Sequence, residues 1–116
     1  MMALNFREEK HKKMLIARTK RCTVRLGDVS NDFPENSVVW ITAGQLGEQK
    51  QKLFTAFLDK VSVKTMATLT SKDLDNQNPE INSREELIAD FERIYKRRIL
   101  PEDTVTVIYF SEIIGL

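Results

Sequence analysis

The chain has 116 residues, of which 41% are hydrophobic and 30% are charged, and its formal net charge is +1. This composition is typical of a soluble globular protein, and we expect a single domain spanning residues 1–116. No apolar run approaches the roughly 20 residues that cross a bilayer, so we expect no membrane contact. A chain with one cysteine has no internal disulfide, which favours a cytoplasmic location.

Positive charge is concentrated near the N-terminus, although the whole chain is almost neutral. Lys and Arg outnumber Glu between residues 7 and 25. A local basic patch can bind nucleic acid weakly and with a marked salt dependence. The same charges also suit a solvated helix face, so charge alone leaves both interpretations open.

Residues 5–17 are predicted to form the first helix, with Asn5 as its N-cap and Phe6 and Leu15 in its apolar stripe. His11 lies among charged residues, which favours an exposed helical histidine over a catalytic or metal-binding one. The sequence has no second histidine, no paired Cys or His spacing and no Gly-rich phosphate loop. We therefore expect neither a metal site nor a cofactor.

The segment Lys-Arg-Cys-Thr-Val-Arg, residues 20–25, carries the clearest functional signal. As a strand over residues 21–26, it would turn Cys22 and Val24 toward a core. Arg21, Thr23 and Arg25 would then share the opposite, polar face. Lys20 has the parity of the core face and can join this cluster only if the strand begins after it or bulges there.

The rest of the chain alternates helical and strand patterns. A loop over residues 27–34 precedes an apolar strand, in which Trp40 is expected to be core, with base stacking as the alternative. The patterns then predict a strand near 53–66, a helical turn over 71–76, a helix over 84–97 with Ser83 and Glu86 as its capping box, and a strand over 104–111. Strands joined by turns, with flanking helices, indicate an α+β fold with a small curved sheet or barrel.

The order of these motifs resembles an ASCH domain of the PUA-like superfamily. The resemblance lies in Lys-x-x-Thr-x-Arg on a strand, Val-Val-Trp-Ile-Thr-x-Gly, Leu-Thr before a short helix, an Arg-Glu-Glu-Leu helix ending near Tyr95, and a closing Asp-x-Val-x-Val-Ile-x-Phe. It spans nearly the whole chain. It implies a small PUA-like β-barrel with flanking helices and a cleft that binds RNA or a modified nucleoside.

Some small bacterial proteins of this kind hydrolyse N(4)-acetylcytidine with a lysine proton acceptor, a threonine nucleophile and a glutamate proton donor. Lys20 and Thr23 match the first two by residue and spacing. The place of the glutamate falls on Gln77, which cannot donate a proton as a carboxylic acid does. Only a shifted alignment would place Asp75 or Glu80 there. In addition, Arg18 stands where these proteins usually have glycine.

Two functions from different classes follow from these residues. The first is a monomeric module that binds RNA, a nucleoside or a nucleotide through a basic cleft. The second is an amidohydrolase acting on N(4)-acetylcytidine or a related acylated nucleoside, with Lys20 and Thr23 as its catalytic residues. The remaining alternatives are an interaction domain that uses its exposed helices, and a Lys20 that is simply a solvated turn residue. The candidate ligand-binding residues are Lys20, Arg21, Thr23, Arg25 and Gln77.

Overall fold

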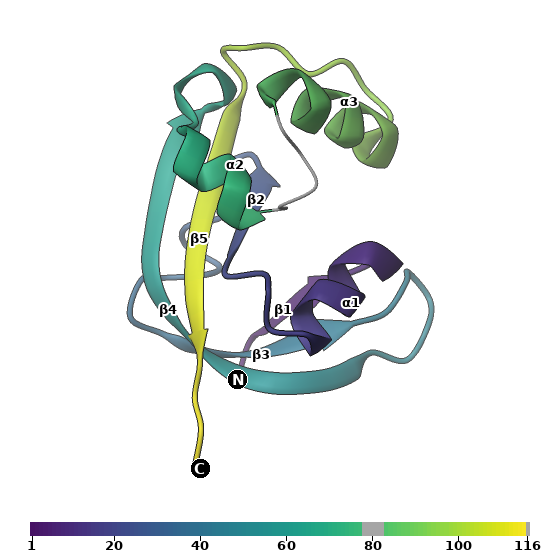
Figure 1. Ribbon diagram of the computed structural model, residues 1–116, viewed down its shortest axis with the longest axis vertical. Helices are drawn as coiled ribbons and strands as arrows, with labels where there is room; N and C mark the ends of the chain where they lie inside the picture. The colour runs from purple at the N-terminus through teal and green to yellow at the C-terminus, as the bar shows by residue number, and fades with distance from the viewer. Residues whose placement is uncertain (78–82, 116) are drawn as a thin grey trace.

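The computed structural model describes residues 1–77 and 83–115. Its centre is a five-stranded sheet in the order β1-β3-β4-β5-β2. The sheet is strongly curled and carries the helices beside it (Figure 1). Among the described residues, the elements are β1 (Ala3–Phe6), α1 (Glu9–Ile16), β2 (Cys22–Leu26), β3 (Val38–Ala43), β4 (Gln51–Thr65), the 3-10 helix η1 (Met66–Thr68), α2 (Ser71–Gln77), α3 (Arg84–Tyr95) and β5 (Thr104–Glu112).

The curvature of the sheet arises in its long central strands. β4 pairs antiparallel with both β3 and β5, and its register with β5 shifts between Leu58 and Lys60. An irregularity of this kind bends a strand and increases its twist. Figure 1 shows β4 running beside β5 and then curving away from it to lie along β3. The expected α+β fold, with a small curved sheet and flanking helices, is thereby confirmed.

The first residues form a strand, so the prediction that a helix begins at Asn5 is wrong. β1 pairs in parallel with β3, placing Asn5 opposite Thr42 and Phe6 opposite Ala43. The Asn5 side chain donates a hydrogen bond to the Gly44 carbonyl at 3.0 Å and accepts one from the Thr42 hydroxyl at 2.9 Å. The Asn5 side chain therefore links β1 to the end of β3 instead of capping a helix.

Trp40 is 40% exposed, so its assignment to the core is wrong. Its strand neighbours Val39 and Ile41 are fully buried, because they point to the opposite face of β3. The Trp40 ring instead contacts the Lys52 ammonium, which lies 5.1 Å from the ring centroid. β3 is thus covered less completely on the Trp40 face than its apolar sequence suggests.

The core consists of two groups of buried side chains separated along the sheet. Leu15 of α1 packs with residues of β1, β3 and β4, including Leu4, Val39 and Leu58. Leu87 of α3 belongs to the other group, which includes residues of β2 and β5. Each group anchors one helix, so α1 and α3 are held at different places on the same curled sheet. Among the described residues, no helix is long and apolar enough to cross a membrane.

α3 begins at the predicted cap, and α2 also begins beside a capping residue. The Ser83 hydroxyl accepts a hydrogen bond from the Glu86 backbone N–H at 3.2 Å, which starts α3. At the start of α2, the Thr70 hydroxyl accepts from the Asp73 N–H and the Asp73 carboxylate accepts from the Thr70 N–H, both at 3.1 Å. The helix predicted to reach residue 97 ends at Tyr95, because Lys96 adopts a left-handed backbone conformation with φ of 55°.

Candidate ligand-binding site

A cavity of about 240 Å³ lies where β1 and β2 approach α1 and α3. Its lining combines the polar side chains of Thr23, Arg25 and Gln77 with aromatic rings that include Phe6 and Phe91. Figure 1 shows α1 and α3 on the same side of the curled sheet, with β2 running behind the space between them. The fold therefore brings together residues that are up to 90 positions apart in the chain, Asn5 and Tyr95.

β2 supplies Thr23 and Arg25, as the alternation of its sequence predicts. Cys22 and Val24 belong to the core, and Thr23 and Arg25 line the cavity together with part of Val24. Thr23 is only 2% exposed, so its hydroxyl lies in the wall and not on the surface. Cys22 is fully buried, and burial raises the pKa of its thiol to about 12, which leaves it unreactive at neutral pH.

Arg25 is fixed in the wall by its contacts with β1. Its Nη2 donates a hydrogen bond to the Asn5 carbonyl at 2.8 Å, and its guanidinium lies 4.8 Å from the centre of the Phe6 ring. Burial lowers the pKa of Arg25, but an arginine remains a cation at any physiological pH. The cavity therefore contains a positioned positive charge next to an aromatic face.

Lys20 stands behind the cavity wall, in contact with Gln77. β2 begins at Cys22, so strand alternation does not fix the direction of the Lys20 side chain. Its ammonium donates to the Gln77 backbone carbonyl and, at 2.6 Å, to the Gln77 side-chain oxygen. Gln77 ends α2, where a helix favours a cation. Lys20 is 2% exposed, so the alternative of a solvated turn residue is wrong.

Burial lowers the pKa of Lys20 to about 7, and the positive charge of Arg25 acts in the same direction. Near neutral pH, a substantial share of the protein therefore carries a neutral amine at this position. Such an amine has two N–H groups, which match the two Gln77 oxygens, and a lone pair that can accept a proton.

The structure does not bring Arg21 to this cavity. Arg21 is exposed and lines a separate hollow of about 470 Å³, which also borders Arg18 and Lys20. Asp75, the first alternative to the family glutamate, is exposed and does not line the cavity. Glu80, the second, lies outside the described residues. Of the described residues that line the cavity, Glu8 carries a carboxylate, which pairs with Arg93 at 3.1 Å.

His11 lines the cavity, and the prediction of an exposed histidine is wrong. Its side chain is 9% exposed and its ring meets the Phe6 ring edge-on, with the ring centroids 6.2 Å apart. Burial lowers the pKa of His11 to about 3, and the nearby Lys20 and Lys10 charges add to this effect. The spacing of His11 and Leu15, i and i+4, was the available signal that both face the sheet.

Groups of three His, Cys, Asp or Glu side chains that could hold a metal ion are absent from the described part of the chain. The polar groups that line the cavity include a hydroxyl, guanidinium groups, amides, an imidazole and the Glu8 carboxylate, all of which can form hydrogen bonds.

No protein-family model and no curated protein matches the sequence. Solved structures nevertheless share its fold. A protein of Enterococcus faecalis from the family DUF984 matches with a TM-score of 0.70 at 13% identity, over 97% of this chain and 76% of that one. An ASCH domain from Lactobacillus crispatus matches with a TM-score of 0.62 at 11% identity, over 96% of this chain and 78% of that one.

The fold is that of an ASCH domain. A protein of Pyrococcus furiosus extends the likeness over 98% of both chains, with a TM-score of 0.59 and 17% identity. At these identities the comparisons establish architecture, and function has to be argued from the site itself. The curled sheet and flanking helices are those expected of a PUA-like barrel, which confirms the fold that the sequence motifs implied.

Proposed function

We propose that this ASCH-type domain binds RNA, or a free nucleoside or nucleotide, by accepting one base into the cavity between α1 and α3. The observation that carries the proposal is the joining of Thr23, Arg25 and Gln77 with aromatic side chains in one concave site. Proteins that recognise single-stranded RNA stack bases on aromatic or arginine planes and form hydrogen bonds with the base edges.

The size of the cavity supports a small ligand. Its volume of about 240 Å³ lies just below the roughly 300–1,000 Å³ of typical small-molecule pockets. Phe91 and Tyr95 provide apolar surface from α3, with their rings 5.4 Å apart, and Phe6 provides it from β1. A single base and its sugar suit such a site better than a double helix.

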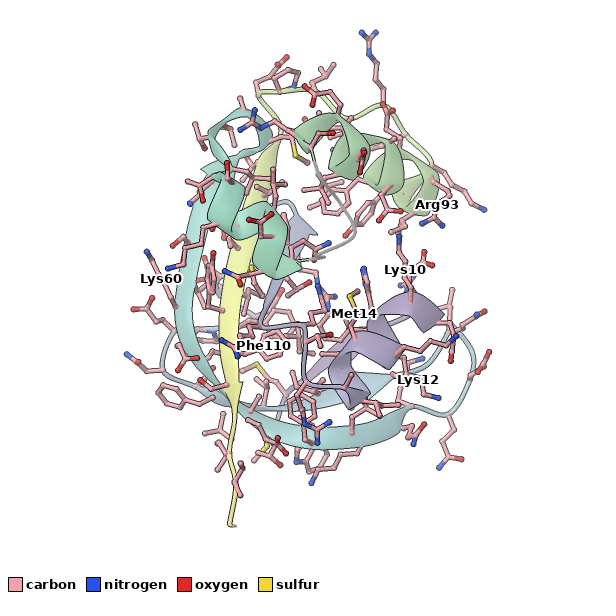
Figure 2. The ribbon with its side chains drawn as sticks, viewed as in Figure 1. Lys10, Lys12, Met14, Lys60, Arg93 and Phe110 are labelled. Atoms are coloured by element: carbon pink, nitrogen blue, oxygen red, sulfur yellow. The ribbon has the colours of Figure 1, made fainter. Side chains whose placement is uncertain are left out.

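Positive charge beside the cavity supports a ligand that carries phosphate. Arg7 and Arg25 line the cavity, and α1 carries Lys10 and Lys12 (Figure 2). Since the net charge of the chain is only +1, phosphate contacts would be local and few. We expect the binding of RNA to weaken with added salt. The slope of log affinity against log salt concentration should be shallow, because each neutralised phosphate contributes only roughly −0.7 to it for a single strand.

Isothermal titration calorimetry with uridine monophosphate, cytidine monophosphate and a single-stranded RNA hexamer tests the proposal. The wild-type protein should bind at least one of them. Thr23→Val, which keeps the shape of the side chain and removes its hydroxyl, should weaken that binding about tenfold. Arg21→Gln is the matched control, because Arg21 is exposed outside the cavity, and it should leave nucleotide binding unchanged. Failure of the wild-type protein to bind any of the three ligands would reject the proposal.

A second candidate function is hydrolysis of N(4)-acetylcytidine, and the pKa of Lys20 is the observation that favours it. In this reaction the Thr23 hydroxyl would attack the acetyl carbonyl while Lys20 accepts its proton. Lys20 would then return the proton to the departing amine, since Gln77 has no acidic proton. Water would release acetate from Thr23, giving cytidine and acetate as products.

The hydrolase function is tested by incubating purified protein with N(4)-acetylcytidine and separating the products by chromatography. Cytidine should form with the wild-type protein and not with Thr23→Val. Lys20→Met should also stop the reaction, while Arg21→Gln should not. If the wild-type protein releases no cytidine between about pH 6 and pH 9, the reaction is rejected and the binding function stands alone.

A further inference from the structure

Two nitrogen atoms of the cavity residues have no hydrogen-bond partner among the residues that the structure describes. They are the Nε2 atoms of His11 and Gln77, both buried and both on side chains that line the cavity. His11 is 9% exposed and Gln77 is 1% exposed. Buried polar groups are almost always hydrogen-bonded, and leaving one unpaired costs about 1–3 kcal/mol. Two such atoms, on side chains that line one cavity, are positions at which a ligand would meet unpaired polar groups.

Lys20 determines which end of the Gln77 amide is left unpaired. The Lys20 nitrogen donates to the Gln77 backbone carbonyl and, at 2.6 Å, to the Gln77 side-chain oxygen, and both the protonated and the neutral amine have the two N–H groups that this requires. If the amide were turned over, its NH₂ group would face a donor. The oxygen is therefore held by Lys20, and the NH₂ group is the end of the amide that is left for another partner. Gln77 thus requires a hydrogen-bond acceptor, such as a carbonyl, on the ligand.

His11 offers the complementary group. Its pKa of about 3 means that the imidazole is neutral at physiological pH. A neutral imidazole has one N–H donor and one acceptor nitrogen, and the unpaired Nε2 accepts when the proton is on Nδ1. Arg25 adds a further donor to the same wall. With the His11 proton on Nδ1, the cavity offers donors to a carbonyl and an acceptor to an N–H group.

We propose that the cavity selects a base with a lactam edge, an adjacent carbonyl and ring N–H as in uracil, through donation by Gln77 and acceptance by His11. In the orientation in which uracil pairs with both residues, cytosine would place its amine against the Gln77 NH₂ group and its unprotonated ring nitrogen against His11 Nε2, so neither contact would form. In this arrangement Lys20 is a positioning residue, which sets the orientation of the Gln77 amide. The inference rests on the proposed binding function and specifies which base that function would recognise.

Titration calorimetry with uridine and with cytidine tests this selection directly. The wild-type protein should bind uridine at least tenfold more tightly. Gln77→Glu replaces the donor with an acceptor of the same shape and should remove or reverse the preference. His11→Phe keeps a ring against Phe6 but removes the acceptor, and it should reduce the preference for uridine.

Two further measurements separate recognition from a general structural effect. Lys20→Met should reduce the preference for uridine, and Lys13→Met on the exposed side of α1 should not. Should Lys20→Met fail to fold, the nitrogen-15 spectrum of wild-type His11 serves instead, because one ring nitrogen should shift when uridine binds. Equal binding of uridine and cytidine would overturn the selection while leaving the binding function intact. Binding of neither nucleoside, together with no binding of the monophosphates or RNA, would overturn both.

Discussion

Burial lowers the pKa of His11 and of Lys20, although the charged residues next to them in the sequence suggest that both are exposed. The His11 ring packs on Phe6, and the Lys20 ammonium reaches Gln77 inside the protein. In both cases the pKa is lowered mainly because the protein interior penalises the charged form. The folded state therefore binds fewer protons than the unfolded state over two pH ranges, and stability should rise with pH in each.

His11 should make the protein sensitive to mild acid. Its pKa of about 3 in the folded state lies below the ordinary value of 6.5, so stability falls as the pH decreases from 6.5 toward 3. Between pH 7 and pH 4.5, wild-type protein should lose on the order of 2 kcal/mol more unfolding free energy than His11→Phe. Urea titrations at the two pH values measure this difference. Equal losses in the two proteins would show that His11 ionises normally in the folded state.

Lys20 should make the protein more stable in mild alkali. The pKa of Lys20 is about 7 in the folded state and 10.5 ordinarily, so the unfolded state binds this proton more tightly than the folded state does. The resulting loss of stability decreases as the pH rises from 7 toward 10.5. Between pH 7 and pH 9, the wild-type protein should gain at least about 1 kcal/mol relative to Lys20→Met. Lys13→Met, which removes an exposed charge, should follow the wild-type curve in the same urea titrations. A Lys20→Met curve parallel to that of the wild type would contradict the lowered pKa.

At the scale of elements, the sequence predicts those structures whose signals are local. α2 and α3 begin at Thr70 and Ser83 because capping residues three positions apart satisfy the first backbone N–H groups. β1 could not be predicted in the same way, because its strand conformation depends on pairing with β3, more than 35 residues away. Without that pairing, Asn5 is a reasonable helix cap. The prediction that Trp40 is in the core was wrong for a related reason, because the composition of a strand does not show which of its faces the helices cover.

Asp73 caps the start of α2 and also links this helix to β4 and β5. Its carboxylate accepts hydrogen bonds from the Tyr109 hydroxyl at 2.6 Å and from Lys64 at 2.8 Å. Burial alone would raise the pKa of Asp73, but the hydrogen bonds from Lys64, Tyr109 and Thr70 outweigh it and lower the pKa to about 2. The carboxylate therefore stabilises the fold above its ordinary pKa of 3.8, and this contribution is lost as the pH falls toward 2.

Asp73→Asn should lower the free energy of unfolding at pH 7 by about 2 kcal/mol, since it removes a charge that accepts several hydrogen bonds. Asp75→Asn, on the exposed side of the same helix, makes the same chemical change and should have little effect. Guanidinium titrations of both variants measure the difference. It should shrink as the pH approaches 2, and an equal effect of the two substitutions would contradict the anchoring role.

At the scale of the whole molecule, the curl of the sheet assembles the site from separate segments. Strand alternation predicts Thr23 and Arg25, and the family resemblance points to Lys20 and Gln77. The sequence could not show that Lys20 and Gln77 touch, because their contact joins residues 57 positions apart. The sequence also did not show that the His11 side chain faces the cavity. Which way that side chain points depends on the residue at which α1 begins, and α1 can begin only after β1 ends. The sequence therefore predicts which residues form the site better than it predicts which of them are in contact.

An ion-pair network joins the two helices beside the cavity. Asp90 of α3 accepts from Lys10 of α1 at 2.9 Å and from Arg93 at 2.5 Å, and Arg93 also pairs with Glu8. Figure 2 shows Lys10 extending from α1 toward α3, near Arg93. The Asp90 side chain is only 10% exposed, so these pairs are less screened than ordinary surface pairs. The network connects helices that pack mainly on different parts of the core.

Asp90→Asn should therefore lower the free energy of unfolding by about 1 kcal/mol in dilute buffer, and by less in 1 M salt, where charges are screened beyond about 3 Å. Glu85→Gln, an exposed position of α3, provides the control for a general loss of negative charge. A double-mutant cycle with Lys10→Met isolates the connection between the helices, because removing Lys10 should have a smaller effect once Asp90 is replaced. Additive effects would mean that Asp90 acts within α3 alone. A positive coupling would mean that the position of α1, and with it that of His11 in the cavity, depends on the charge of Asp90.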